Sequence, residues 1–224
     1  MGTTGLCDRS DLCAEFSGTT DTEFTRTYFP MVRRCLAETA DSVAVVDLSP
    51  LVVGHVLVCP RAHYFSAAQA IADITCDFGR FLERFLRVYA HIFGGFTLLE
   101  HGSTAAMRTA CISHAHVHVL PLALEPIIGR MSYDGLSLTL LDSWQGVIDL
   151  CLDRSPYYLA ADGDRFFVAR PPQRLISQYL RVVAGAAAAI PPEECDWAVV
   201  IRHEIFQRTI QRWAVGAATE GVML

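Results

Sequence analysis

Three histidines, His114, His116 and His118, alternate with apolar residues near the middle of this 224-residue chain. Successive side chains of a β-strand point to opposite faces of a sheet, so every second residue shares a face. The spacing therefore predicts an extended segment in which the three imidazoles line one face, while Ala115 and Val117 enter a core on the other. We expect this segment to belong to a sheet.

The three side chains also carry distinctive chemistry. Imidazole is the only side chain whose unperturbed pKa lies near physiological pH, so it serves as nucleophile, proton carrier or metal ligand. The chain has 8 histidines. Chance would place three of them at this spacing in roughly 0.01 of such chains, a low false-positive risk for a short motif. We favour a reaction centre; a strand that only binds metal and a structural coincidence are the alternatives.

Two blocks of sequence resemble the histidine triad (HIT) superfamily. Residues 114–120 match its signature His-φ-His-φ-His-φ-φ, where φ is apolar, and residues 47–63 resemble its upstream stretch D-x-x-P-x-x-x-G-H-x-L-V-x-P-K/R-x-H. The resemblance implies an α+β fold, a HIT-like antiparallel sheet with helices packed on it. We place a HIT domain at residues 1–125 and a C-terminal α/β extension, packed on that core, at residues 126–224.

Patterns along the first part of the chain agree with this fold class. Apolar runs at residues 43–46, 56–58 and 96–99 are typical of strands. Residues 77–93 carry apolar side chains at helical period opposite a charged face, which predicts an amphipathic helix. A shorter helix is predicted at residues 67–74.

The extension has patterns of its own. Asp162-Gly163 lies between two apolar runs and predicts a hairpin. Residues 175–189 are predicted to form a helix, ended by the prolines that follow. Residues 199–210 fit a strand or a helix equally.

Composition limits the class of protein. Hydrophobic residues make up 52% of the chain, and the net charge is −6 without a basic run, which argues against nucleic acid as the main ligand. No apolar stretch is long enough to span a membrane, and the N-terminus lacks the basic-then-apolar order of a secretory signal. The 8 cysteines are scattered. We expect a reduced, cytoplasmic enzyme with a small-molecule substrate and neither nucleic acid nor membrane as partner.

The chain contains no lysine. This excludes a P-loop lysine and a Schiff-base lysine. Phosphate would have to be held by backbone N–H groups, hydroxyls, histidine or arginine.

The resemblance implies chemistry at the α-phosphorus of a nucleotide. The central histidine, His116, would attack phosphorus in line and form a nucleotidyl-histidine intermediate, which water or another acceptor releases. His118 would contact phosphoryl oxygens and protonate the leaving group, and His114 and His63 would orient His116 or complete the phosphate pocket. The second ring nitrogen of His116 needs an acceptor to set its tautomer, for which we expect a strand carbonyl.

Nucleotide-binding positions are also carried over from the family. Asp47 matches an acidic residue that accepts hydrogen bonds from ribose hydroxyls; the alternative is a local turn aspartate. Glu100 stands where many HIT proteins have an asparagine that contacts phosphate, and a carboxylate there would repel a phosphate oxyanion.

A second departure lies just before the triad. Common HIT hydrolases carry a Gly-Gln-Ser/Thr run that contacts phosphate, whereas this chain has Thr109-Ala110-Cys111. Phosphate recognition would therefore differ, and Arg108, Thr109 and Ser113 are the candidates for it.

Metal is a separate question. Some HIT members bind structural zinc through two N-terminal cysteines and two histidines, and the equivalents here are Cys7, Cys13, His63 and His114. Zinc prefers four such ligands in a closed site, and the alternative is buried free cysteines. The expected reaction requires no cofactor.

Three further features keep more than one interpretation. Arg181 is either a solvated helix residue or a contact to phosphate or substrate. His55 is expected to pack or bond locally. HIT proteins are usually homodimers joined through the central helix, so the stripe at residues 78–93 would form that interface or pack inside one subunit.

Three functions follow for the whole chain. The first is a nucleotidyl hydrolase or transferase that cleaves a phosphoramidate, phosphoanhydride or phosphoester bond through His116. The second is a HIT fold recruited for a biosynthetic reaction on a non-nucleotide substrate, which Glu100 favours. The third is a nucleotide-binding module without turnover, against which the intact triad argues.

Overall fold

The computed structural model describes residues 10–31, 33–103, 114–151, 155–171 and 178–220. The helices are α1 (Asp11–Phe16), α2 (Glu23–Tyr28), α3 (Ala67–Ala72), α4 (Phe78–Phe93), α5 (Leu124–Tyr133), α6 (Trp144–Leu150), α7 (Tyr179–Ala187) and α8 (His203–Glu220). The strands are β1 (Cys35–Glu38), β2 (Ser42–Val46), β3 (Val56–Pro60), β4 (Thr97–Gly102), β5 (Val117–Leu120), β6 (Leu138–Leu141), β7 (Tyr157–Ala161) and β8 (Phe166–Ala169).

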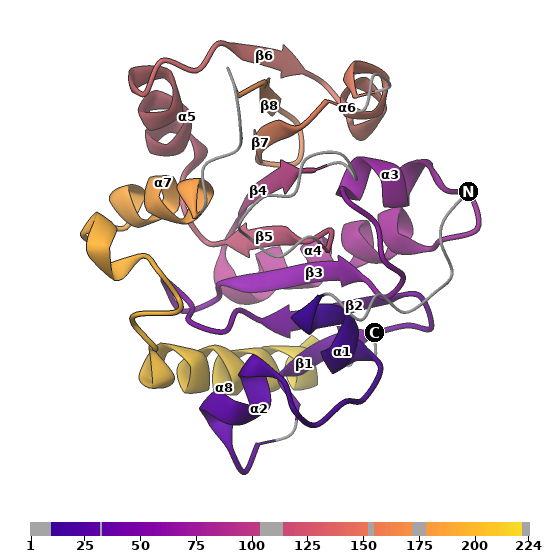
Figure 1. Ribbon diagram of the computed structural model, residues 1–224, viewed down its shortest axis with the longest axis vertical. Helices are drawn as coiled ribbons and strands as arrows, with labels where there is room; N and C mark the ends of the chain where they lie inside the picture. The colour runs from indigo at the N-terminus through magenta and orange to yellow at the C-terminus, as the bar shows by residue number, and fades with distance from the viewer. Residues whose placement is uncertain (1–9, 32, 104–113, 152–154, 172–177, 221–224) are drawn as a thin grey trace.

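Within the described ranges, the strands form one antiparallel sheet of eight, in the order β1-β2-β3-β5-β4-β7-β8-β6 (Figure 1). The predicted α+β fold class is confirmed. The sheet is continuous across the boundary predicted at residue 125, because β7 pairs along β4 from Leu98↔Ala161 to Gly102↔Tyr157. The C-terminal segment thus extends the sheet edge to edge.

The added strands mirror the connectivity of the first ones. β3, two helices, β4 and β5 follow one another along the chain, and β6, α6, β7 and β8 do likewise. In the sheet, β3-β5-β4 is followed by β7-β8-β6, so the two sets meet at β4 and β7 in inverted order. No histidine occurs between His118 and His203, so only the first set carries the triad.

The amphipathic helix predicted at residues 77–93 is confirmed as α4, with the eight apolar side chains of its stripe buried. They pack against the sheet and against α8, whose Trp213 stacks on Phe85 with ring centroids 5.0 Å apart. The stripe therefore packs inside one subunit, which was one of its two interpretations. The homodimer stays a prediction from sequence, and this stripe is not the surface that would form it.

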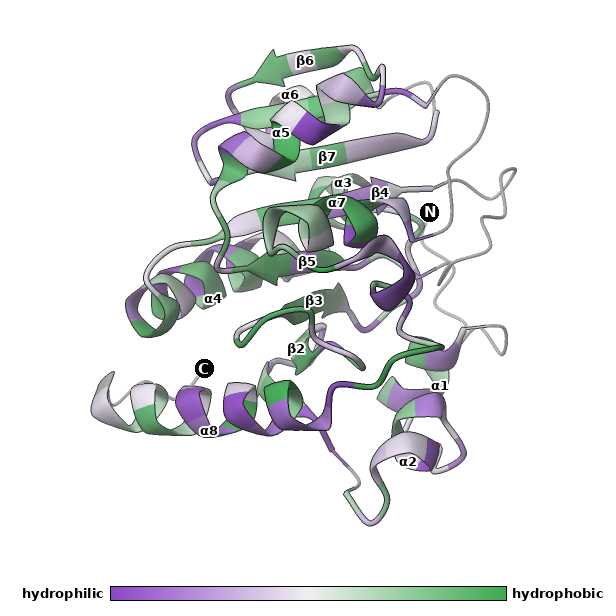
Figure 2. Ribbon diagram, turned by 90° about the vertical axis from the view of Figure 1, so that its left-hand side faces the viewer, coloured by the Kyte–Doolittle hydropathy of each residue, from purple (hydrophilic) through white to green (hydrophobic). Residues whose placement is uncertain are grey.

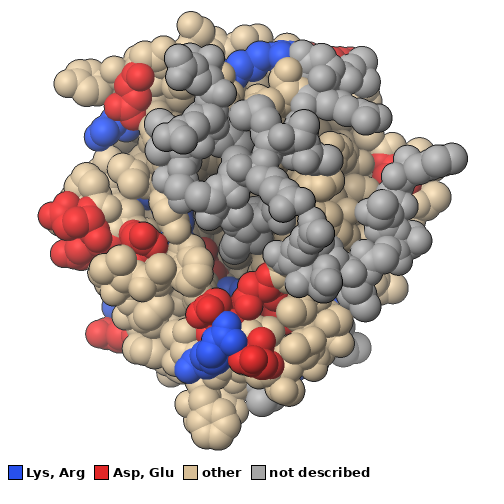
Figure 3. Space-filling model, in the orientation of Figure 1, with Lys and Arg blue, Asp and Glu red and all other residues tan. Residues whose placement is uncertain are grey.

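Helices cover both faces of the sheet. Valines and leucines of the strands face α3, α4, α6 and α8 on one side, and a second apolar cluster joins α5 and α7 to the other. Figure 2 shows the hydrophobic colouring concentrated on the strands between these layers. On the face in Figure 3, acidic and arginine side chains of the described residues lie side by side. None of the described helices is both long and apolar enough to cross a membrane.

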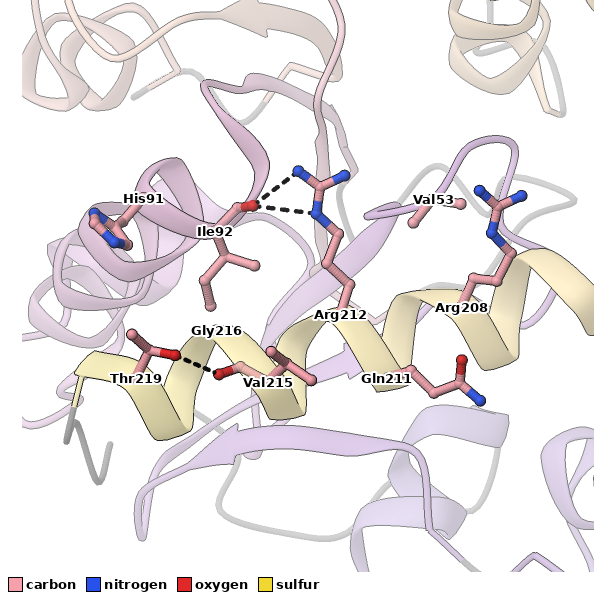
Figure 4. A pocket seen from close by; sticks show the side chains of 9 residues that line it. All are labelled: Val53, His91, Ile92, Arg208, Gln211, Arg212, Val215, Gly216 and Thr219. Carbon is pink, nitrogen blue, oxygen red and sulfur yellow. Dashed lines mark hydrogen bonds between the residues drawn. The ribbon is translucent and has the colours of Figure 1, made fainter.

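A groove between α4 and α8 encloses about 590 Å³ (Figure 4). His91 and Ile92 border it from α4, and Arg208 and Arg212 from α8; Arg212 donates to the Ile92 carbonyl at 3.0 and 3.2 Å. None of the residues predicted to be catalytic lines this groove, so it is not the expected site.

The triad strand is shorter than predicted. β5 begins at Val117, whose partner on β3 is Val58. β3 ends at Pro60, which has no N–H to offer a ladder. The residues before β5 instead cross the loop after β3, where Ala115 N donates to the Tyr64 carbonyl at 2.7 Å.

Candidate active site

The triad histidines are buried and fall into two groups. His116 and His118 have ring centroids 5.0 Å apart and line one small cavity. His114 faces away from that cavity toward Cys13 and His63. Val117 enters the core on the α4 side. Side chains of the triad segment therefore alternate between two faces, as predicted. His114 does not share the cavity of His116 and His118.

The hydrogen bond of His116 fixes which of its ring nitrogens carries the proton. Its Nδ1 lies 2.7 Å from the His114 carbonyl oxygen, and a carbonyl only accepts, so Nδ1 carries the proton. Burial lowers the pKa of His116, so the ring is neutral and its Nε2 keeps a lone pair. The expected acceptor is a carbonyl within the triad itself.

His118 is oriented by a histidine outside the triad. Leu51 N donates to His55 Nδ1 at 3.1 Å, and His55 Nε2 lies 2.9 Å from His118 Nδ1. Neutral His55 must therefore carry its proton on Nε2 and donate it to His118, which leaves the His118 proton on Nε2. Burial lowers the pKa of His55 to about 4 and that of His118 well below its usual value. His55 does bond locally, as predicted, through Leu51 N. Its second partner is a triad histidine, His118.

Asp47 is held by an arginine from the far end of the chain. Its Oδ1 accepts from Arg181 Nη1 at 2.8 Å and from Ser49 N at 2.9 Å. Burial would raise the pKa of Asp47, but Arg181, the neighbouring His55 and His118 and the hydrogen bond from Ser49 N together lower it and hold the carboxyl ionised. Arg181 is only 5% exposed, so its interpretation as a solvated helix residue is wrong.

The cavity at His116 and His118 measures about 50 Å³. That volume holds roughly one or two waters. Its walls come from both halves of the chain. The C-terminal segment contributes Tyr158, Gln178, Tyr179, Leu180, Arg181 and Trp197. The C-terminal segment therefore borders whatever binds beside His116.

His101 was not assigned a role from sequence. It lies on β4, with its ring centroid 5.1 Å from that of His116, and it lines the same cavity. Its position two residues after Leu99, which pairs with His118, places it on the histidine face. A prediction of which strands neighbour the triad strand would have found it.

The alternation of side chains along β4 also corrects the role predicted for Glu100. This residue points to the opposite face from His101, where Oε1 accepts from Ala67 N at 2.6 Å and Oε2 accepts from the Tyr157 hydroxyl at 2.7 Å. It is 1% exposed and does not line the cavity. Its assignment as a nucleotide-binding position beside phosphate is therefore wrong, and Glu100 anchors the first turn of α3. Arg108, Thr109 and Ser113 lie outside the described residues.

Glutamine in place of Glu100 is expected to stabilise the protein at alkaline pH only. Burial raises the pKa of Glu100 from 4.5 to about 7. A raised carboxyl pKa contributes stability that is present below pH 4.5 and lost as pH rises through 7. Raising the pKa from 4.5 to about 7 corresponds to about 3 kcal/mol at pH 8. Urea unfolding of both proteins at pH 8 and pH 4.5 measures this, and an equal effect at the two pH values would contradict it.

Cys13, His63 and His114 form a separate cluster of donor atoms. Cys13 Sγ lies 3.3 Å from His63 Nδ1 and 3.1 Å from His114 Nδ1. His114 Nε2 donates to the Pro60 carbonyl at 2.6 Å, so its Nδ1 has a lone pair directed at the sulfur. The thiol can donate to His114 Nδ1 and accept from His63 Nδ1–H, and a metal ion would instead use the lone pairs of all three atoms. Cys7 lies outside the described residues.

The helix that carries Cys13 is fixed by a buried ion pair. Arg34 donates from Nε and Nη2 to the two oxygens of Glu15, at 2.9 and 2.8 Å. Arg34 is 4% exposed and also donates to the Val46 carbonyl at 2.8 Å. α1 is thereby pinned to β2, and Cys13 is held against the two histidines.

Part of the chain is similar to one known family. Residues 32–123 match the family model described as HIT domain. An uncharacterised HIT-like protein of Methanocaldococcus jannaschii is 26% identical over 80 residues, which cover 35% of this chain and 60% of that protein. The chain thus spans less than two thirds of that relative's length.

Several solved structures are also similar. A HIT-like protein involved in cell-cycle regulation from Bartonella henselae has a TM-score of 0.40 and 15% identity, over 52% of this chain and 79% of that one. A protein of Streptococcus mutans has a TM-score of 0.41 and 18% identity, over 60% and 87%. A hypothetical histidine triad nucleotide-binding protein of Sulfolobus tokodaii has a TM-score of 0.33 and 23% identity, over 39% and 59%.

Proposed function

Because residues 32–123 match the family model described as HIT domain, we propose that the chain is a nucleotidyl hydrolase or transferase of the HIT superfamily. It would cleave a phosphoramidate, phosphoanhydride or phosphoester bond of a nucleoside phosphate through a nucleotidyl-histidine intermediate. The observation that carries the proposal is the hydrogen bond from His116 Nδ1 to the His114 carbonyl, because it leaves the Nε2 lone pair for attack.

In the first step, His116 Nε2 attacks phosphorus in line. The N–P bond forms as the bond from phosphorus to the leaving group breaks, and the leaving group departs with the electron pair and takes up a proton. In the second step, water or another acceptor attacks phosphorus, loses its proton, and the N–P bond breaks. Neutral His116 is then restored.

His118 contributes a fixed N–H donor. With Nδ1 accepting from His55, its Nε2–H would bind a phosphoryl oxygen and stabilise the charge that develops there. The role of proton donor to the leaving group, predicted from sequence, would first require His118 to be protonated, which its burial opposes. We therefore assign His118 primarily to oxygen stabilisation.

Turnover of a substrate panel tests the proposal. Nucleoside phosphoramidates, dinucleoside polyphosphates and nucleotide sugars are incubated with the full chain, and release of nucleoside monophosphate is followed by chromatography and ³¹P NMR. Cleavage of at least one class with multiple turnovers is expected. Binding without cleavage would favour a non-catalytic module.

The ion pair between Asp47 and Arg181 favours one alternative. A carboxylate that is already bound to arginine is a poor acceptor for ribose hydroxyls. A non-nucleotide substrate would not need that acceptor. A panel in which no nucleotide is bound or cleaved would therefore support the recruited, biosynthetic HIT fold.

We further propose that Cys13, His63 and His114 hold a structural zinc ion. The three donor atoms lie within 4.8 Å of one another, and a tetrahedral zinc would set its S and N ligands about 3.5 Å apart. Burial lowers the pKa values of His63 and His114, which keeps both rings neutral as ligands. Zinc here would fix α1 on the triad segment.

Purified without chelators, the protein is expected to contain about one zinc per chain by plasma mass spectrometry. Cys13→Ser should lower the zinc content severalfold and lower the melting temperature. Cys76→Ser, outside the cluster, is the matched control and should retain the metal. A native protein free of zinc after growth with added zinc would contradict the assignment.

A further inference from the structure

The proposed reaction needs a side chain that carries a proton. The leaving group must take up a proton in the first step, and the acceptor must lose one in the second. His116 is the nucleophile, and His118 keeps its proton on Nε2 for a phosphoryl oxygen, because His55 donates to its Nδ1. Burial also opposes a positive charge on His118. A further group of the cavity has to carry the proton.

His101 lies directly beside the nucleophile. β4 runs between β5 and β7 (Figure 1). Leu99 of β4 pairs with His118 of β5, and two residues further along β4, His101 comes across from His116. The ring centroids of His101 and His116 lie 5.1 Å apart, with the ring planes at 82°. Both rings line the same cavity, so one phosphoryl group bound there can contact both.

His101 also lies closer to solvent than the triad histidines of this cavity. His116 and His118 are 5% and 7% exposed, whereas His101 is half-buried. Three more residues that line the cavity are half-buried: Gln178, Tyr179 and Trp197. Together with His101 they mark the open side of the cavity. A charged imidazole is penalised less where water reaches it, so His101 can exchange a proton with solvent and present it to a bound substrate.

We propose that His101 is the acid–base catalyst, which protonates the leaving group and then takes a proton from the acceptor. The inference rests on the proposed nucleotidyl transfer at His116. In the first step, His116 Nε2 bonds to phosphorus, the bond to the leaving atom breaks, and that atom keeps the electron pair and receives the proton of the His101 imidazolium. In the second step, neutral His101 takes a proton from water as the water oxygen bonds to phosphorus and the N–P bond breaks. The imidazolium is thereby restored.

This role favours substrates whose leaving group needs a proton. An amine leaves phosphorus readily only when it is protonated, whereas p-nitrophenolate leaves as a stable anion. A positioned acid contributes about 10²–10⁴-fold to the rate of a step that includes proton transfer, and little to a step that does not. Loss of the acid should therefore affect the two kinds of substrate unequally.

The test compares nucleoside 5′-phosphoramidates of the four bases with the corresponding 5′-(p-nitrophenyl) phosphates, using the full chain. His101→Gln keeps an amide N–H that can bind a phosphoryl oxygen, but it has no acidic proton to give. It should lower kcat/KM about 100-fold or more for the phosphoramidates and less than about threefold for the p-nitrophenyl esters. With the esters, a burst of about one p-nitrophenolate per chain should precede slow turnover, because release from His116 still needs a base. His91→Gln, exposed on α4, is the matched control and should behave as the native chain with both series.

The outcomes separate two failures. Equal losses of kcat/KM for the two series would show that His101 binds phosphate without transferring a proton, and native rates with both would show that it takes no part. Either result overturns the inference and leaves nucleotidyl transfer standing. A native chain that cleaves no member of either series contradicts the proposed function, and this inference with it. If circular dichroism shows His101→Gln to be unfolded, His101→Asn replaces it in the same comparison.

Discussion

Replacing His116 by asparagine is expected to lower kcat/KM by about four orders of magnitude or more, because removal of a covalent nucleophile has effects of that size. Asparagine keeps a polar side chain of similar length, so its amide can still donate to the His114 carbonyl, the partner of His116 Nδ1. It has no nitrogen lone pair with which to attack phosphorus. The loss should therefore fall on kcat, while substrate affinity changes little.

The control is His91→Asn, on the exposed side of α4 in the groove away from the triad. It should leave kcat and KM unchanged. Stopped-flow or chromatographic turnover and equilibrium titration with a nonhydrolysable analogue measure the two parameters. A His116→Asn protein that keeps more than about a tenth of native kcat would show that another group attacks phosphorus.

Replacing Arg181 by methionine is expected to lower the free energy of unfolding by about 3–5 kcal/mol, since breaking a buried ion pair leaves one charge uncompensated. Methionine preserves much of the side-chain volume, so packing contributes little to the loss. The pair joins α7 to the Asp47 loop, with both side chains 6% exposed. The second variant, Asp47→Asn combined with Arg181→Met, removes both charges and should be less destabilised than Arg181→Met alone.

Arg165→Met is the matched control. Arg165 also forms ion pairs, with Asp162 and Glu125, but its side chain is 43% exposed. Exposed pairs contribute about 0–1 kcal/mol, so this variant should unfold close to the native midpoint in urea. Equal effects of the two arginine substitutions would contradict a buried, structural pair at Arg181.

Local pattern was enough for the fold class and for much of the site. The stripe at residues 78–93 predicted α4 because helical period and burial coincide in it. The hairpin predicted at Asp162-Gly163 is observed between β7 and β8. The triad alternation placed His116 and His118 on one face, because a two-residue period needs only local backbone geometry.

The features that depend on contacts between distant segments could not be predicted from the sequence. Asp47 and Arg181 meet across 134 residues of sequence through tertiary packing alone, and nothing in either local sequence records that neighbour. Glu100 was misplaced because the parity of β4 relative to β5 depends on register, with Leu99 opposite His118. The start of α8 at His203 resolved a segment whose pattern fitted helix and strand alike.

The central claim, covalent catalysis by His116, is tested most directly by trapping the intermediate. The native chain is mixed with a cleaved substrate, quenched within milliseconds under alkaline denaturing conditions, which preserve phosphorus–nitrogen bonds, and analysed by intact mass and peptide sequencing. A nucleotidyl adduct is expected on the peptide containing His116, with none in His116→Asn. An adduct on another residue, or rapid turnover with no adduct at any quench time, would contradict the mechanism.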